Sequence, residues 1–253
     1  MEDYIVGLIV AGVFFWTILF LLTKRIFQER SFDFSLRVVS SIHAIIAVTL
    51  ASLSIQDWSC PIFPLPSKSS PMQIQTLAIS GAYLIFDLAC CQFSDNINLD
   101  TIFHHLVCIL GIWAGLASER YGSEMVAALW LGEISGPFLH LRDLLKELGY
   151  RGTDLNLAID ILFAIIFTAA RMIVGPYLTY AFLFSDSPLL MKAVALGLQL
   201  VSAFWVYKIV RMVIHKLSSK GMPSSQPAVD GEASYKCCVP PLRRLPQCCG
   251  PPQ

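Results

Sequence analysis

The sequence contains repeated apolar stretches, each long enough to cross a lipid bilayer as a helix, which takes about 20 residues. They recur from Tyr4 to His215 with only short polar breaks between them. The seven segments that we distinguish are 4–22, 34–55, 72–93, 101–118, 124–141, 155–177 and 188–210. Helices pair their own backbone polar groups, which hydrocarbon cannot do for them. The sequence therefore predicts an all-α fold, a polytopic membrane bundle of about seven transmembrane helices.

Lysine and arginine gather in alternate loops of this predicted bundle. They follow the first segment at Lys24, Arg25 and Arg30, the fifth at Arg142, Lys146 and Arg151, and the seventh at Lys208, Arg211, Lys216 and Lys220. The loops between carry little positive charge, chiefly Lys68 and Arg120. By the positive-inside rule, the N-terminus is expected in a lumen or outside the cell, and the C-terminus in the cytosol. The formal net charge is zero, and we expect no nucleic-acid partner.

The C-terminal tail, residues 217–253, is rich in Pro, Ser and Gly, and we expect it to be disordered. It carries two pairs of adjacent cysteines close to basic residues: Cys237, Cys238, Cys248 and Cys249. S-acylation of these thiols would hold the tail against the membrane. A tetrathiolate zinc site is the alternative, but adjacent cysteines ligate one metal awkwardly. We therefore predict no metal there, and we select no metal-binding residues elsewhere in the chain. A tail without any such role stays open.

Several ionisable residues lie inside the apolar segments, where each costs some 2.5 kcal/mol or more and is a functional candidate. They are Arg37, His43, Asp87, His104, His105, Glu133, His140, Asp160 and Arg171. A rise of 1.5 Å per residue gives depths of roughly 5 to 13 Å from the cytosolic edge for most of them. All but Arg171 fall in the cytosolic half of the membrane. This clustering predicts one central cavity, open toward the cytosol.

Adjacent residues on a helix point about 100° apart. We therefore expect only one of His104 and His105 to line the cavity, while the other contacts a neighbouring helix. Asp87 with a histidine has a simpler interpretation as an ion pair that fixes the register of two helices.

The fifth segment contains Pro137 between two ionisable residues. Glu133 and His140 are seven residues apart and share a helix face. Pro137 cannot donate the backbone hydrogen bond that the Glu133 carbonyl would accept, so we expect the helix to bend there. His140, like Arg37, has an alternative role as a residue that only extends to the membrane interface.

Four strings of residues carry a resemblance to a known family. They are Arg37 to Ala44 (RVVSSIHA), Tyr83 to Asp87 (YLIFD), Phe103 to Cys108 (FHHLVC) and Glu133 to Leu139 (EISGPFL). Together they resemble the TLC-domain family, which includes ceramide synthases and translocating-chain-associated membrane proteins. The chain is most similar to the small members of the TLC domain-containing protein 5 (transmembrane protein 136) type. The likeness covers about residues 30 to 215.

The resemblance implies a helical bundle around a cavity in the endoplasmic reticulum or another endomembrane, with the plasma membrane left open. It divides the chain into 1–30, the first helix and a basic loop, 31–216, a six-helix TLC-type bundle, and the tail, 217–253. In ceramide synthases, paired histidines and two downstream aspartates support acyl transfer from coenzyme A to a sphingoid amine. His104 and His105 match the histidine pair. Glu133 stands near the first aspartate position and Gly136 at the second.

Two functions follow from this resemblance. The first is a lipid-handling protein that binds a lipid or acyl chain in the cavity and influences membrane lipid composition. The alternative is an acyl-CoA-dependent acyltransferase with a histidine general base, acyl-CoA being a co-substrate and no other cofactor being expected. The candidate catalytic residues are His104, His105, Asp87 and Glu133, and the other candidate polar cavity residues are Arg37, His43, His140 and Arg171. Membrane lipids are the expected partners, and a homo-oligomer stays open.

Overall fold

A computed structural model describes residues 2–55, 68–93 and 99–220 of the chain, and the regular elements of these residues are helical. Their bounds are α1 Glu2–Ile26, α2 Phe32–Ser54, α3 Pro71–Cys90, α4 Leu99–Ser118, α5 Gly122–Glu133, α6 Gly136–Leu145, α7 Asp154–Ala169, α8 Gly175–Phe184 and α9 Leu189–Lys220. The one β-type pairing within these residues is an isolated bridge between Lys68 and Arg120. The predicted all-α fold is confirmed.

Six stretches of helix are each long and apolar enough to cross a membrane. They are α1, α2, α3 with the 3₁₀ turn that follows it, α4, the continuous α7–α8 segment and the first 23 residues of α9. They match six of the seven predicted segments. The remaining one is divided between α5 and α6, neither of which is long enough to span alone. The chain is thus a multi-pass membrane helix bundle.

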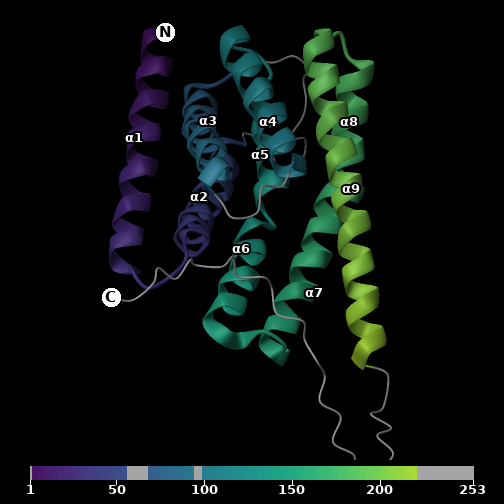
Figure 1. Cartoon of the computed structure of the whole chain (residues 1–253). Helices are drawn as coiled ribbons and strands as arrows, with labels where there is room; N and C mark the ends of the chain where they lie inside the picture. Colours follow the sequence, from purple (N-terminus) through teal and green to yellow (C-terminus); the bar gives the residue numbers. More distant parts are fainter. Residues whose placement is uncertain (1, 56–67, 94–98, 221–253) are drawn as a thin grey trace, which may run out of the picture.

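The packing of the helices brings together those that carry the ionisable residues selected from the sequence. In Figure 1, α1 lies at one edge of the bundle and α8 and α9 at the other. α1 packs against α2 and α3, α3 against α4, and α4 against α9. α6 packs against both α2 and α7. α5 packs against α2 and α3, so the interior lies among α2, α3, α4, α5, α6, α7 and α9.

The fifth predicted segment is interrupted at Ile134 and Ser135, between α5 and α6. Pro137 lies in the first turn of α6, where its missing N–H costs least. A Cβ on Gly136 would lie 2.9 Å from the Cβ of Ala44, so the glycine allows α6 to approach α2 closely. The predicted bend at Pro137 is confirmed.

A second irregularity, which the sequence analysis did not predict, joins α7 to α8. Residues Ala170–Val174 form a π-helical turn before Pro176. In such a turn, the carbonyl of Arg171 would accept a bond from residue 176, which is a proline and has no N–H. The side-chain amide of Gln199 on α9 donates to this carbonyl instead, at 3.2 Å.

The last helix is longer than predicted, because α9 runs to Lys220 and passes the expected boundary at residue 216. The rest of the tail, with its four cysteines, lies outside the described residues. The proline-rich segment at 56–67 also lies outside them.

Close packing of α1 against α3 generates a stability prediction. A Cβ on Gly12 would lie 2.6 Å from the Cβ of Ala82, whereas a Cβ on Gly7 would meet nothing within 4 Å. Gly12→Ala should therefore destabilise the protein by about 1–3 kcal/mol, the usual cost of overpacking. Gly7→Ala, the matched control on the same helix, should be neutral or stabilising by up to about 1 kcal/mol, since alanine favours helix. Thermal unfolding in detergent would contradict this if Gly12→Ala melted at or above Gly7→Ala.

Candidate functional site

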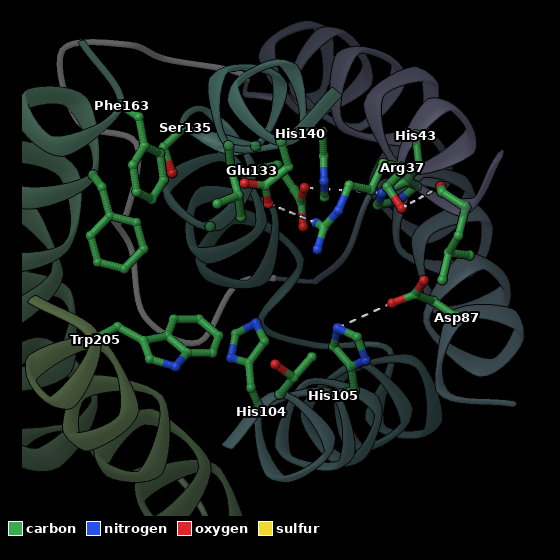
Figure 2. A pocket seen from close by; sticks show the side chains of 18 of the residues that line it. Arg37, His43, Asp87, His104, His105, Glu133, Ser135, His140, Phe163 and Trp205 are labelled. Atoms are coloured by element: carbon green, nitrogen blue, oxygen red, sulfur yellow. Dashed lines mark hydrogen bonds and ion pairs between the residues drawn. The ribbon is translucent and has the colours of Figure 1, made fainter. Parts of the chain in front are cut away.

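A pocket of about 510 Å³, which we call the polar pocket, lies among α2, α3, α4, α5, α6, α7 and α9. Its lining includes all eight residues that the sequence analysis selected inside the membrane for catalysis or lipid contact: Arg37, His43, Asp87, His104, His105, Glu133, His140 and Arg171. Figure 2 shows seven of them around the same space. Residues from distant parts of the chain are thus brought together, although their roles stay predictions.

One wall of the polar pocket is formed by Asp87 on α3 and His105 on α4. The Nε2 atom of His105 lies 3.4 Å from the Oδ2 atom of Asp87 (Figure 2). Both side chains are about nine-tenths buried. The distance exceeds the usual range of about 2.7–3.2 Å for a hydrogen bond to oxygen. The pair therefore holds α3 beside α4 loosely and leaves both groups facing the pocket.

His104 lies on the same helix but points toward the opposite side. Its ring centroid is 4.9 Å from that of Trp205 on α9, and its Nε2 atom is 3.6 Å from the sulfur of Cys108. The expectation that only one of the paired histidines would line the cavity is therefore wrong. The 100° between them directs one ring toward α9 and the other toward α3, and the polar pocket spans both.

A second acid–histidine pair lies in the part of the polar pocket lined by α2 and α5. The Nδ1 atom of His43 on α2 lies 4.0 Å from the Oε2 atom of Glu133. The His43 ring stacks on Tyr83, with centroids 3.7 Å apart and planes 8° from parallel. The Tyr83 hydroxyl in turn bonds the hydroxyl of Ser40 at 2.8 Å. Stacking fixes the imidazole plane, so the edge that faces Glu133 is held in place.

Charged side chains near the helix ends form a rim, which we call the charged mouth: Asp33, Arg37, Asp100, Arg142, Asp143 and Lys208. Most of these charges are paired. Arg37 lies 3.1 Å from Asp143, and Lys208 lies 3.0 Å from Asp100. The mouth is therefore held together by ion pairs between helices that are distant in sequence.

Arg142 in the charged mouth contacts Asp143 on the same helix and Asp160 on α7. Its Nε atom lies 3.0 Å from Asp160 on α7, whose side chain is almost fully buried. Asp160 itself does not line the polar pocket. This buried pair joins α6 to α7, and Asp160 therefore has a structural partner rather than a place in the site.

Arg171 is the one candidate residue that the sequence analysis placed outside the cytosolic half of the membrane. Helical rise places it away from the other residues, yet it lines the polar pocket from the π-helical turn between α7 and α8. Its guanidinium donates to the carbonyl of Gly132 at 2.9 Å and to the hydroxyl of Ser202 at 3.0 Å. It makes no ion pair within the described part of the chain. The two groups that accept these hydrogen bonds are thus neutral, and the guanidinium also lies over the Phe167 ring, 5.2 Å from its centroid.

The sequence analysis missed several residues of the site. Trp205, which the sequence analysis did not select, lines the polar pocket, and its indole N–H donates to Asp100 at 2.6 Å. Tyr83 was noted only as part of a family string. The spacing of Trp205 and Lys208 is the signal that could have found this edge. The two residues are three apart on α9, share a face and both bond Asp100.

A comparison with protein families supplies an independent finding. The family model described as the TLC domain matches residues 26–211. The match covers well over half of the 253 residues and includes every residue that lines the polar pocket. A membrane bundle, the ordered polar strings and this match agree, and the chain belongs to the TLC-domain family.

Proposed function

We propose that this protein handles a membrane lipid, binding its polar headgroup in the polar pocket and influencing membrane lipid composition. Membership of the TLC-domain family supports a function related to membrane lipids. The observation that carries the proposal is that eight of the nine ionisable side chains within the apolar segments line one pocket of a membrane bundle. Such residues are costly in hydrocarbon and are kept where they contact each other or a ligand.

The size of the polar pocket favours a headgroup with the start of its chains. Small-molecule sites usually enclose about 300–1,000 Å³, and the polar pocket, at about 510 Å³, lies within this range. Long acyl chains would extend from it between the helices toward the surrounding bilayer.

The charges of the polar pocket favour a zwitterionic or neutral polar headgroup. Its lining holds five carboxylates, four side chains of Lys or Arg, and four histidines, so neither sign dominates. Beyond the mouth, Arg171 donates hydrogen bonds to a neutral carbonyl and a neutral hydroxyl, and the Glu133 carboxylate lies 4.0 Å from the imidazole of His43. Arg171 would bind a phosphate or carbonyl oxygen, and Glu133 an amine or hydroxyl. A ligand with both kinds of group satisfies both residues.

The finer assignment is also part of the proposal. We place the chain with the TLC domain-containing protein 5 type, in the endoplasmic reticulum or another endomembrane, with its N-terminus lumenal. The charged mouth supports a cytosolic opening, since Arg142 and Lys208 belong to the basic clusters that the positive-inside rule assigns to the cytosol. Lipid headgroups of the cytosolic leaflet would then have the shorter path into the polar pocket.

Lipid retention tests the main proposal. Glu133→Gln removes one of the five carboxylates that line the polar pocket, whereas Glu124→Gln makes the same change at a fully buried glutamate on α5 that does not line it. Losing a charged hydrogen bond costs about 1.5–3 kcal/mol, or about 10-fold or more in affinity. Mass spectrometry of the purified protein should find one lipid class on the wild type and on Glu124→Gln, and far less on Glu133→Gln. A lipid-free wild type, or equal loss in both variants, would refute the proposal.

Acyl transfer is a second candidate function, favoured by the paired histidines and the Asp87–His105 contact. A histidine would take the proton of an amine or hydroxyl as that atom bonds to the thioester carbonyl carbon. The carbon–sulfur bond then breaks, and the imidazolium returns the proton to the coenzyme A thiolate. General-base help of this kind is worth about 10²- to 10⁴-fold in rate.

A transfer assay tests this candidate with labelled acyl-CoA and a panel of lipid amines and alcohols. His104→Ala and His105→Ala should each lower the rate at least about 100-fold, whereas Glu124→Gln should retain it. If no acyl-CoA supports transfer to any acceptor while lipid is still retained, the catalytic candidate fails and the lipid-handling proposal stands.

A further inference from the structure

Three side chains with metal-binding atoms converge on the wall of the polar pocket where α3 ends beside α4. Asp87, Cys91 and His105 each place one ligand atom within 4.8 Å of the other two. Asp87 and Cys91 are four residues apart and so share a face at the end of α3, while His105 comes from the facing helix. Asp87 and His105 are buried, Cys91 is partly buried, and all three line the polar pocket.

The spacing of Asp87 and His105 suits two ligands of one ion better than a direct hydrogen bond. Zinc binds nitrogen and oxygen at about 2.0–2.2 Å in a tetrahedron, which separates two such ligand atoms by about 3.3–3.6 Å. The measured separation of 3.4 Å falls in this interval. It is long for a hydrogen bond between the same atoms.

The polar atoms of this cluster are poorly satisfied by the protein alone. The Nδ1 atom of His105 is buried and has no hydrogen-bond partner among residues 2–55, 68–93 and 99–220. Cys91 is a free thiol. Buried polar groups are normally bonded, and an exception calls for a bound group or a chemical role. A metal ion would bind the Nε2 atom of His105, which faces Asp87, and the Cys91 sulfur at once, while Nδ1 would carry the imidazole proton and stay outside the metal site.

The donor set selects the metal. One nitrogen, one thiolate sulfur and one carboxylate oxygen are ligands that Zn²⁺ accepts, whereas Mg²⁺ and Ca²⁺ require oxygen. The carboxylate and the thiolate together carry two negative charges, so a divalent ion makes the buried cluster neutral. Three protein ligands leave a fourth tetrahedral position, as in zinc sites that act on a ligand.

We propose that Asp87, Cys91 and His105 form a zinc site in the wall of the polar pocket, with its open coordination position facing the pocket interior. A water molecule or an oxygen of a lipid headgroup would occupy that position (Figure 2 shows Asp87 and His105 beside the pocket space). The site goes beyond the proposed function, because binding of the ion depends only on these three side chains. It adds a Lewis acid for headgroup oxygens to the polar pocket.

Cobalt binding tests the site, since Co²⁺ replaces Zn²⁺ and a cobalt–thiolate bond has its own charge-transfer absorption. The full-length protein in detergent, stripped of metal, should take up one equivalent of Co²⁺ and develop this band. Cys91→Ser should abolish the band and weaken binding by more than the roughly 10- to 100-fold typical of a lost outer-shell partner. Cys90→Ser is the matched control, since Cys90 is adjacent but outside the cluster, and it should retain the band.

Two further measurements keep the proposal open to refutation. A variant with Cys237, Cys238, Cys248 and Cys249 all changed to Ser should keep the band, which excludes the tail as its source. His105→Ala should lower the affinity for Co²⁺, although this variant should remain as well folded as Cys90→Ser. Absence of the band in the wild type, its survival in Cys91→Ser or its loss with the tail cysteines would overturn the zinc site. None of these outcomes depends on whether lipid is retained.

Discussion

Charged groups are costly to hold in hydrocarbon, and the structure depends on how the helices compensate their charges. At the charged mouth the cost is met within the protein, since Arg37 pairs with Asp143 and Lys208 with Asp100. Farther in, Arg171 is bound only by a carbonyl and a hydroxyl, and Glu133 has an imidazole 4.0 Å away. Groups that the protein leaves incompletely compensated are the ones that gain most from a polar ligand. The contrast between mouth and interior therefore points to the interior as the place where a headgroup binds.

Much of the fold and the membership of the site could be predicted from sequence, because both follow from local signals. Apolar length defined the spans, and Pro137 defined the bend. Ionisable residues within apolar runs identified eight of the residues that line the polar pocket, together with Asp160, which does not line it. What sequence could not provide was the partner of each residue. Asp87 meets His105, and Arg142 meets Asp160, because α3 turns toward α4 and α6 toward α7. Such rotations are set by packing, which periodicity within one helix does not encode.

The zinc site and the acyl-transfer candidate involve different walls of the polar pocket, so they are compatible. A zinc ion would engage His105 and Asp87 on the α3–α4 side, whereas His104 lies against Trp205 on the α9 side. His104 would then be the histidine free to exchange a proton, and His105 would act through the metal. The adjacent histidines, which looked redundant in sequence, would have separate tasks because 100° of helix rotation separates them.

The two irregular helices explain how a membrane bundle can build such a site. Pro137 ends α5 near Gly132, and Pro176 forces the π-helical turn that carries Arg171. The two irregularities meet, since the guanidinium of Arg171 donates to the carbonyl of Gly132 at 2.9 Å. Irregular backbone is tolerated at membrane depth only where protein or a polar cavity satisfies it. The prolines therefore do more than interrupt two helices, because the irregular backbone beside each of them helps to position Arg171 in the lining of the polar pocket.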